Sequence, residues 1–316
     1  MFSLIPVLAV GDIMAFVRAL PGATAQGLVW GIMAIGVFLT FKILDFADLT
    51  VDGTMSTGGA VTVMLILAGY NPIVAVCMAF LAGMMAGIVT GILHTVFGIP
   101  DILAGILSQI ALYSINMNIA QGKANQAVSV DFYHLVISGR NNPLTIATVI
   151  GILIVIIAIL YWFFGTEIGF TIRATGCNQA MSRAQGINTS LAKVIALAFS
   201  NGLVGLAGGM LAQYQGNYDV NMGRGSIVIG LASVIIGEVI GEAIFGKKLN
   251  FSGRLAFVAV GSIIYYFVIQ FVLWLGLPTI DMKLFSAIVV AIFLAVPYIR
   301  KKSKNSYRKA AKGGVN

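Results

Sequence analysis

Charged side chains are scarce in this sequence, where Asp, Glu, Lys and Arg together make up 9% of the 316 residues. A soluble globular domain carries about 25%, so the scarcity of charge excludes a water-soluble fold. Apolar residues make up 59% of the chain, which indicates that the protein lies mainly in lipid. Most of the net charge of +8 falls in short loops and in the C-terminal tail. Membrane topology explains that charge without a nucleic-acid partner.

Cysteine and histidine are nearly absent, with two residues of each type. Cys77 falls in an expected membrane span and Cys177 in a polar segment, so no disulfide is predicted. His94 and His134 stand alone, and no H-E-x-x-H or G-x-S-x-G motif occurs. The segment that ends at Lys248 approaches a phosphate-binding loop, but this lysine replaces the hydroxyl residue that binds Mg²⁺. We therefore predict a protein that is not an enzyme and that itself binds no metal and no cofactor.

Long apolar runs dominate the sequence, and each is near the ~20 residues that cross a hydrocarbon core. We predict an all-α polytopic membrane protein with eight to nine transmembrane helices in one bundle. The predicted spans are Thr24–Ile43, Thr54–Ala68, Ile73–Phe97, Ile102–Ala120, Leu144–Phe164, Leu191–Tyr214, Ser226–Phe245, Leu255–Leu275 and Leu284–Ile299. Glycines recur four residues apart in Gly83–Gly87–Gly91 and Gly205–Gly209, a spacing that lets helix backbones approach closely in lipid.

Three parts are predicted along the chain. Residues 1–22 are too interrupted by polar residues and proline for a span, and we expect an interfacial helix that ends at Pro21-Gly22. Residues 23–299 form the transmembrane domain, and residues 300–316 form a basic cytoplasmic tail. The start of the chain lacks a basic n-region, which argues against a cleaved signal peptide.

A polar island, residues 169–189, separates two of the predicted spans and carries Arg173 and Arg183 but no acidic residue. Asn178 is placed to cap a short helix that Gly186 would end. So short a helix does not cross a bilayer, and therefore we expect it to lie at one membrane surface. Its positive charge assigns that surface to the cytoplasm, and the same orientation puts the C-terminus inside.

A second unusual stretch, residues 44–59, combines Asp45, Asp48 and Asp52 with four hydroxyl residues and three glycines. Acidic, glycine-rich backbone between two spans is typical of a discontinuous helix, which is tolerated only where it lines a cavity or is buried in protein. The alternative is an ordinary cytoplasmic loop whose aspartates cap the following span. The residues alone leave both interpretations open.

Polar side chains inside membrane spans usually face the interior of the bundle. They supply candidates for a solute path, of which some will serve only as hydrogen bonds between helices. The candidates are Asp48, Thr50, Asp52, Thr54, Ser56, Gln109, Tyr113, Asn116 and Asn201. Glu238 and Glu242 share one helical face close to Lys247 and Lys248, where we expect a structural ion pair.

The sequence resembles ABC-importer permeases of the branched-chain amino acid and ribose permease family in three places. The island is similar to their coupling region at Gly169, Ile172, Arg173, Ala174, Asn178, Ala180, Ala184, Gly186, Ile187 and Asn188. The stretch from Asp45 to Gly59 is similar to their N-F-A-x-G segment, although aspartates stand at Asp45 and Asp48. Residues 188–246 are similar to their C-terminal half. Residues 98–119 are similar to a subgroup assigned to amino-acid uptake, of the tryptophan or tyrosine type.

The resemblance implies the permease subunit of an importer in a bacterial plasma membrane. Two copies would enclose a path for a small solute, an amino acid with aromatic ones among the candidates. An external binding lipoprotein would deliver this solute. A separate ATPase subunit would bind ATP and Mg²⁺ and grip the island. The implied coupling residues are Arg173, Asn178, Gln179, Ala180, Arg183, Ala184, Gly186 and Ile187. The alternative from another class is a secondary transporter driven by an ion gradient, with the three aspartates of residues 44–59 as its working carboxylates.

Overall fold

The structure is a computed structural model that describes residues 13–129, 133, 135–246 and 249–275, together with the isolated positions 284, 287, 288, 291 and 295. The predictions for residues 1–12 and for the tail at 300–316 lie outside the described residues. So does most of the ninth predicted span.

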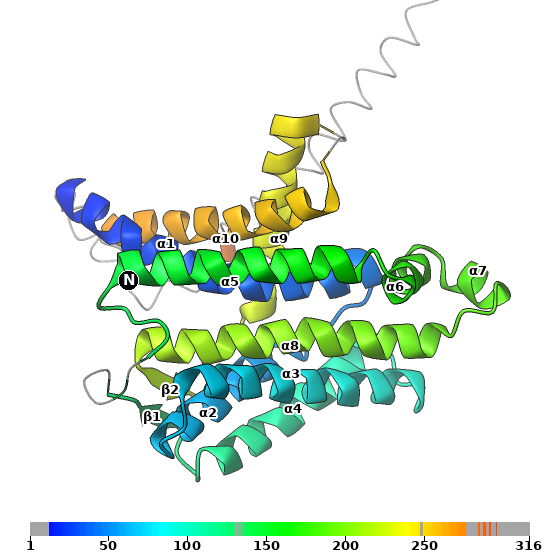
Figure 1. Cartoon of the computed structure of the whole chain (residues 1–316), viewed down its shortest axis with the longest axis horizontal. Coiled ribbons are helices and arrows are strands. Elements are labelled where there is room, and N and C mark those ends of the chain that lie inside the picture. Colours follow the sequence, from blue (N-terminus) through cyan, green and yellow to red (C-terminus); the bar gives the residue numbers. More distant parts are fainter. Residues whose placement is uncertain are drawn as a thin grey trace, which may run out of the picture.

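The described chain is a bundle of helices with one two-stranded sheet (Figure 1). The helices are α1 (Ile13–Phe38), the π-helical turn η1 (Leu39–Leu44), α2 (Val51–Leu67), α3 (Pro72–Thr95), α4 (Asp101–Ile119), α5 (Asn142–Phe163), α6 (Glu167–Cys177), α7 (Gln179–Ala184), α8 (Thr189–Gln215), α9 (Ser226–Phe245) and α10 (Phe251–Trp274). Seven described helices are long and apolar enough to cross a membrane, and α2 is a shorter apolar helix. The all-α polytopic fold is confirmed, because each of the first eight predicted spans corresponds to one of these helices.

The expected end of an N-terminal helix at Pro21-Gly22 is wrong, because α1 runs through both residues without interruption. A proline inside a helix removes one backbone hydrogen bond and bends the helix more readily than it ends one that is packed on its neighbours. Nearly all side chains from Ala23 to Phe38 are buried. The packing of this long stretch therefore outweighs the local cost of Pro21.

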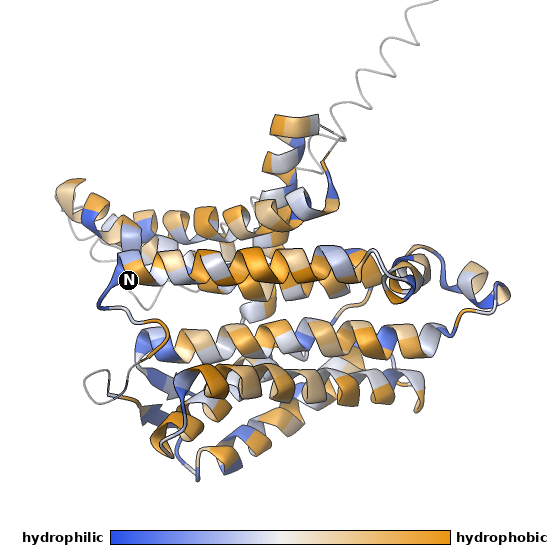
Figure 2. Cartoon of the chain, in the orientation of Figure 1, coloured by the Kyte–Doolittle hydropathy of each residue, from blue (hydrophilic) through white to orange (hydrophobic). Residues whose placement is uncertain are grey.

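α1 and α8 form the centre of the bundle, whereas α3, α4 and α5 lie on its outside. In the most apolar part of each helix, 83% of the residues of α1 and 78% of those of α8 are buried. The same fraction is 33% in α3 and 28% in both α4 and α5. α8 packs against α1, α2 and α3, and α1 packs against α9 and α10. Figure 2 shows the hydrophobic colour concentrated along the helices and the hydrophilic colour at their ends.

The contact between α3 and α8 explains the glycine spacing in the sequence. A side chain at Gly83 or Gly87 would overlap the backbone carbonyl oxygen of Asn201 or Leu197 on α8. Gly205 approaches α3 just as closely, because a Cβ atom there would lie 2.5 Å from the carbonyl oxygen of Ala79. The prediction that these glycines allow close helix packing is confirmed.

The two polar ends of the bundle lie on opposite sides (Figure 1). α6 and α7, which belong to the polar island, lie at one end. At the other end, β1 (Asn125–Ala127) pairs antiparallel with β2 (Asn217–Asp219), with Gln126 opposite Tyr218. Most of the long helices run between these ends, whereas α9 lies across that direction (Figure 1).

Candidate functional site

The segment between η1 and α2, Asp45–Thr50, enters the bundle from the end that carries the island. Asp45 ends η1 with a left-handed backbone, φ 56°. Two residues earlier in the chain, the carbonyl oxygen of Ile43 lies against Gly176 of α6. α2 then begins beside the middle of α8, where Thr54 Oγ1 donates to Asn201 Oδ1 at 2.8 Å. The alternative of an ordinary surface loop is wrong, because Asp48 and Thr50 are only 1% and 0% exposed.

A network of hydrogen bonds around Asp48 holds this break in place. Asp48 Oδ2 accepts from Asn201 Nδ2 at 2.6 Å, and Oδ1 accepts from the backbone nitrogen of Thr50 at 2.9 Å. Thr50 Oγ1 is hydrogen bonded to Thr90 Oγ1 on α3 at 2.8 Å, and Thr90 Oγ1 donates to Ser108 Oγ on α4 at 2.7 Å. Three helices, α3, α4 and α8, thus converge on the start of α2, and the polar groups satisfy one another.

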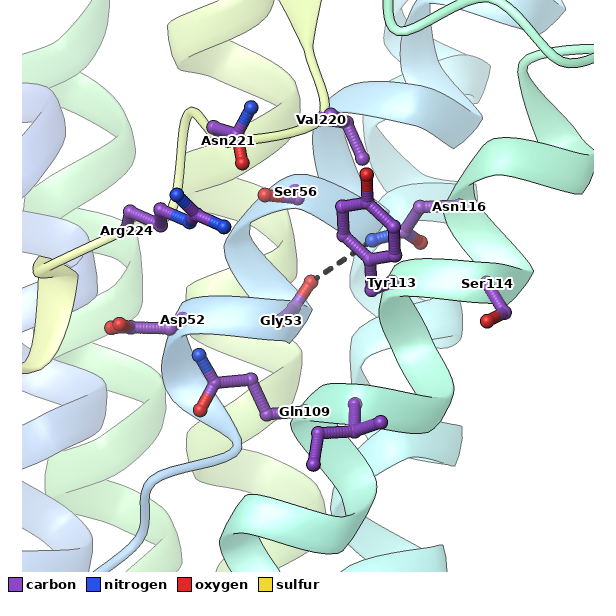
Figure 3. Close-up of a pocket in the computed structure, with 11 residues that line it drawn as sticks. Asp52, Gly53, Ser56, Gln109, Tyr113, Ser114, Asn116, Val220, Asn221 and Arg224 are labelled. Carbon is purple, nitrogen blue, oxygen red and sulfur yellow. Dashed lines mark hydrogen bonds between the residues drawn. The ribbon is translucent and has the colours of Figure 1, made fainter.

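A cavity of about 390 Å³ opens next to this network, between α2, α4 and the loop from β2 to α9 (Figure 3). Its lining residues are Asp52, Gly53, Ser56, Gln109, Ile110, Tyr113, Ser114, Asn116, Val220, Asn221 and Arg224. The structure therefore divides the nine predicted path residues into two groups. Five line the cavity, whereas Asp48, Thr50, Thr54 and Asn201 belong to the buried network beside it.

Asp52 serves as the N-cap of a helix that lies 173 residues further along the chain. Its Oδ2 accepts from the backbone nitrogen of Gly225 at 2.9 Å, and its Oδ1 accepts from that of Ile227 at 3.0 Å. α9 begins at Ser226, and Gly225 at its N-cap position has no side chain to offer. The carboxylate therefore supplies the capping acceptor and offsets the positive end of the helix dipole.

The loop after β2 brings Arg224 to the first turns of α2, where its side chain is exposed and borders the cavity. Gly223 of this loop donates its backbone N–H to Ser56 Oγ at 3.2 Å, and it leaves no room for a side chain against the carbonyl oxygen of Asp52. The sequence analysis did not include Arg224 among the path candidates, because this residue lies between two predicted spans. The two glycines that flank it, Gly223 and Gly225, are the signal that could have marked a closely packed turn.

Asn116 contributes the one lining amide that is almost fully buried, at 1% exposed. Its Nδ2 donates to the carbonyl oxygen of Gly53 at 3.3 Å, the dashed line in Figure 3. Its Oδ1 is buried and has no hydrogen-bond partner. The cavity wall therefore contains an unused acceptor at the level of α2.

The island folds as predicted around Asn178, whose side chain accepts from the backbone nitrogen of Met181 at 3.0 Å and caps α7. Gly186 follows the helix with a left-handed φ of 81°. Ala180, Arg183, Ala184 and Gly186 are exposed, as is Asn178 itself, while Gln179 and Ile187 are half-buried. α7 thus stands out at the end of the bundle as a short capped helix.

α6 fixes the island to the bundle. Arg173, which was expected to act with α7, is only partly exposed, and its guanidinium lies over the rings of Phe164 and Phe251, 5.3 and 4.6 Å from their centroids. Ile172 is fully buried, and Gly176 lies against the backbone of Ile43. Arg173 therefore belongs to the packed base of the island and not to its exposed tip.

The ion pair expected near Glu238 has a different partner in the structure. Glu238 Oε2 lies 2.9 Å from Lys42 Nζ on η1, while Lys247 and Lys248 lie outside the described residues. Cys77 and Cys177 are both free and exposed. Within residues that the structure describes, no three His, Cys, Asp or Glu side chains gather into a possible metal site.

Comparison with known proteins gives the family. The profile of the family described as "Branched-chain amino acid transport system / permease component" matches residues 20–297. The chain belongs to this family. It is therefore an integral membrane protein and a permease component of an ABC-type transport system, and the resemblance drawn from the sequence is confirmed.

Three relatives of this permease component carry different descriptions. It is 41% identical to a tyrosine transport system permease protein of Clostridioides difficile, over 85% of this chain and 88% of that protein. It is 30% identical to an uncharacterized protein of Rickettsia prowazekii, over 86% and 95% of the two chains. It is 26% identical to a ribose import permease protein of Escherichia coli, over 86% and 83%. No solved structure matches the chain.

Proposed function

We propose that this chain is the transmembrane subunit of an ABC importer that carries an amino acid, with aromatic amino acids as the first candidates. The observation that carries the proposal is α7, an exposed and capped helix at the end of a membrane bundle whose base is firmly packed. The tyrosine transport permease, at 41% identity, supports the choice of solute class.

In this proposal α7 inserts into a separate ATPase subunit, which binds ATP and Mg²⁺. A closing motion of the ATPase pushes on α7 and is passed to α6, which contacts η1 through Gly176 and Ile43. The chain continues directly from η1 into the break at Asp45–Thr50 and then into α2. Displacement of the island therefore acts on the segment that positions the cavity, which is how access would alternate between the two sides.

A second copy of the chain completes the path. Tyr113 is 48% exposed and Ser114 is exposed on the outer side of α4, where they border the cavity. A polar, open cavity within a membrane bundle is costly if it faces lipid. A homodimer in which this face meets its equivalent would enclose the cavity and give the solute a continuous route.

The orientation follows from charge. With the island and the C-terminus in the cytoplasm, the β1–β2 end faces outward in the bacterial inner membrane. An extracytoplasmic solute-binding protein, expected to be a lipoprotein, would dock there and deliver the solute. Of the three carboxylates that the ion-driven alternative would use, those of Asp48 and Asp52 are already bound by amide donors. Asp45 is exposed at the end of η1 and does not line the cavity.

The experiment is co-purification of the detergent-solubilised permease with its ATPase, followed by an ATP hydrolysis assay and uptake in proteoliposomes. Replacing residues 178–186 by a Gly-Ser segment of equal length should abolish ATPase binding. The same replacement of residues 121–124, at the opposite end of the bundle, is the matched control and should leave it intact. Uptake that needs no ATPase and collapses when the ion gradient is dissipated would contradict the proposal.

A further inference from the structure

We infer that Arg224 and Asn116 form a recognition site for the carboxylate and amino groups of an α-amino acid, in the cavity between α2, α4 and the β2–α9 loop. The inference rests on the proposed function and assigns that solute class to particular side chains. It is carried by three observations on this cavity: an unpaired cation, an unpaired buried acceptor, and the character of the wall between them.

Arg224 is the unpaired cation. The loop holds it beside the first turns of α2, and Figure 3 shows its guanidinium directed toward the cavity side of Ser56 and Asp52. It makes no ion pair with any acidic residue that the structure describes. Asp52 is the nearest acid among the lining residues, but both of its oxygens accept backbone N–H groups at the start of α9.

Arg224 is exposed on the cavity side of the chain, and an ionisable residue that faces a cavity in a membrane protein commonly marks the route of a substrate. The planar guanidinium matches a carboxylate through two parallel hydrogen bonds. A solute carboxylate would therefore supply the counter-charge that the protein itself does not provide.

Asn116 Oδ1 is the unpaired acceptor. The residue is 1% exposed and lines the cavity, and its Nδ2 is already used by the carbonyl oxygen of Gly53. A buried acceptor without a partner is unfavourable, and a ligand that donates a hydrogen bond removes that cost. The ammonium group of an amino acid is such a donor, and it would reach Oδ1 once the Asn116 amide turns toward the cavity, because that atom is itself buried.

The rest of the wall favours an apolar or aromatic side chain on the solute. Ile110, Tyr113 and Val220 line the cavity, with the tyrosine ring at its centre in Figure 3. The volume of about 390 Å³ lies in the range of about 300–1,000 Å³ that small-molecule sites occupy. A ring stacked on Tyr113 would place the two charged groups of the solute toward the polar residues.

The test uses the full transporter in proteoliposomes, with its ATPase and binding protein, and L-tyrosine as the probe. Arg224→Gln should lower L-tyrosine uptake at least about tenfold, the loss expected for a charged hydrogen bond, while ATPase binding stays unchanged. Arg224→Lys keeps the charge and should retain part of the uptake. Lys123→Gln, an exposed cation at the same end of the bundle but outside the cavity, is the matched control and should not change uptake.

A binding measurement separates the site from the transport cycle. In a Cys77→Ser, Cys177→Ser background, a Ser114→Cys substitution places a thiol at the cavity for maleimide labelling. L-tyrosine should slow the labelling, whereas tyramine, which lacks the carboxylate, and ribose should not. Arg224→Gln should remove the protection by L-tyrosine, and Asn116→Leu should weaken it.

Three outcomes overturn the inference in distinguishable ways. If the transporter takes up L-tyrosine and Arg224→Gln leaves both the uptake and the protection within twofold of the unsubstituted protein, the cavity assignment is wrong and the proposed function stands. If tyramine protects as well as L-tyrosine, recognition of an amino-acid carboxylate is refuted. It is also refuted if the intact transporter, with its ATPase and binding protein, takes up no amino acid, and the proposed solute class then fails as well.

Discussion

Two polar interruptions divide the apolar helices of this permease, and they differ in what surrounds them. The break at Asp45–Thr50 lies inside the bundle, where Asp48 and Thr50 bond to α3 and α8. The tip of the island at α7 is exposed and is held by its own cap, Asn178. Both stretches are polar, one acidic and the other basic, and their roles differ because the neighbouring helices bury only the first.

Within the island, α6 is the packed part and α7 is the exposed part. Its inner face packs through Ile172 and Gly176, and Arg173 lies on two aromatic rings. The island therefore has a rigid base and an exposed tip. A substitution at the base should act through stability and transmission, whereas one at the tip should act on the partner alone.

The largest effect on stability is expected when a hydrogen-bond donor is removed from the buried network around Asp48. Asn201→Leu removes the N–H group that Asp48 Oδ2 accepts at 2.6 Å and leaves a buried carboxylate short of a partner. The expected loss is about 3 kcal/mol in the free energy of unfolding, measured by SDS titration in detergent micelles. Asn118→Leu, at an exposed amide on α4, is the control. Equal stability of the two variants would show that the network does not hold α2.

The base of the island should tolerate substitution less well than an open glycine on a neighbouring helix. Gly176→Val pushes a side chain into the backbone of Ile43, where no space exists, and should cost about 1–3 kcal/mol. Gly151→Val on α5 has no atom within 4 Å of its Cβ position and serves as control. The ATPase in complex with Gly176→Val should also hydrolyse ATP without matching uptake. Normal coupling in that variant would refute the route through η1.

The tip should show the opposite balance, with a large effect on transport and a small one on stability. Gly186→Val places a β-branched residue at φ 81°, which costs about 1–2 kcal/mol locally and distorts the end of α7. Uptake should be abolished while the protein remains in the membrane with nearly unchanged thermal stability. Gly186→Asn, which tolerates this backbone conformation, should restore most of the uptake. Normal uptake by Gly186→Val would remove α7 from the mechanism.

Tyr218, at the end opposite the island, gives a reference with the smallest expected effect. Its hydroxyl is buried without a hydrogen-bond partner, so Tyr218→Phe should change stability at pH 7 by less than about 1 kcal/mol. Burial, with smaller contributions from Asp219 and Tyr113, raises the pKa of Tyr218 from 10.0 to about 12.

The raised pKa of Tyr218 sets the direction of a pH effect. Since the folded form holds the proton more tightly, its contribution to stability is present below pH 10 and is lost as the pH rises toward 12. Tyr218→Phe should make that loss of stability shallower in alkaline unfolding experiments. Tyr70→Phe, at a residue that is 58% exposed, should leave the curve unchanged, and identical curves for both variants would contradict the assignment.

Local features of this fold were predictable because neighbouring residues determine them. The spans follow from apolar length, the start of α7 from the cap at Asn178, and the close approach of α3 and α8 from glycines spaced by four. Pro21 led to a wrong helix end, because the energetic cost of a proline inside α1 is outweighed by the burial of the residues that follow it.

The candidate site was predictable only in part, because its geometry depends on contacts between distant residues. Thr54 and Asn201 are hydrogen bonded across 147 positions, and Asp52 caps a helix 173 positions away. No local pattern shows that Asp48 and Asp52, four residues apart, face a closed network and an open cavity respectively. For the same reason Arg224 was placed outside the site.

The cap that Asp52 provides for α9 has a thermodynamic consequence. α9 begins at the cavity and carries Glu238, which pairs with Lys42 on η1, next to the base of the island. Under the proposed function, we expect a change at either end of α9 to affect the other end, and the free energy of such a linkage has a single value. If solute in the cavity changes the affinity of α7 for its ATPase by some factor, ATPase binding must change the affinity for solute by the same factor. Titrating solute in the presence and absence of the ATPase would measure it from both sides.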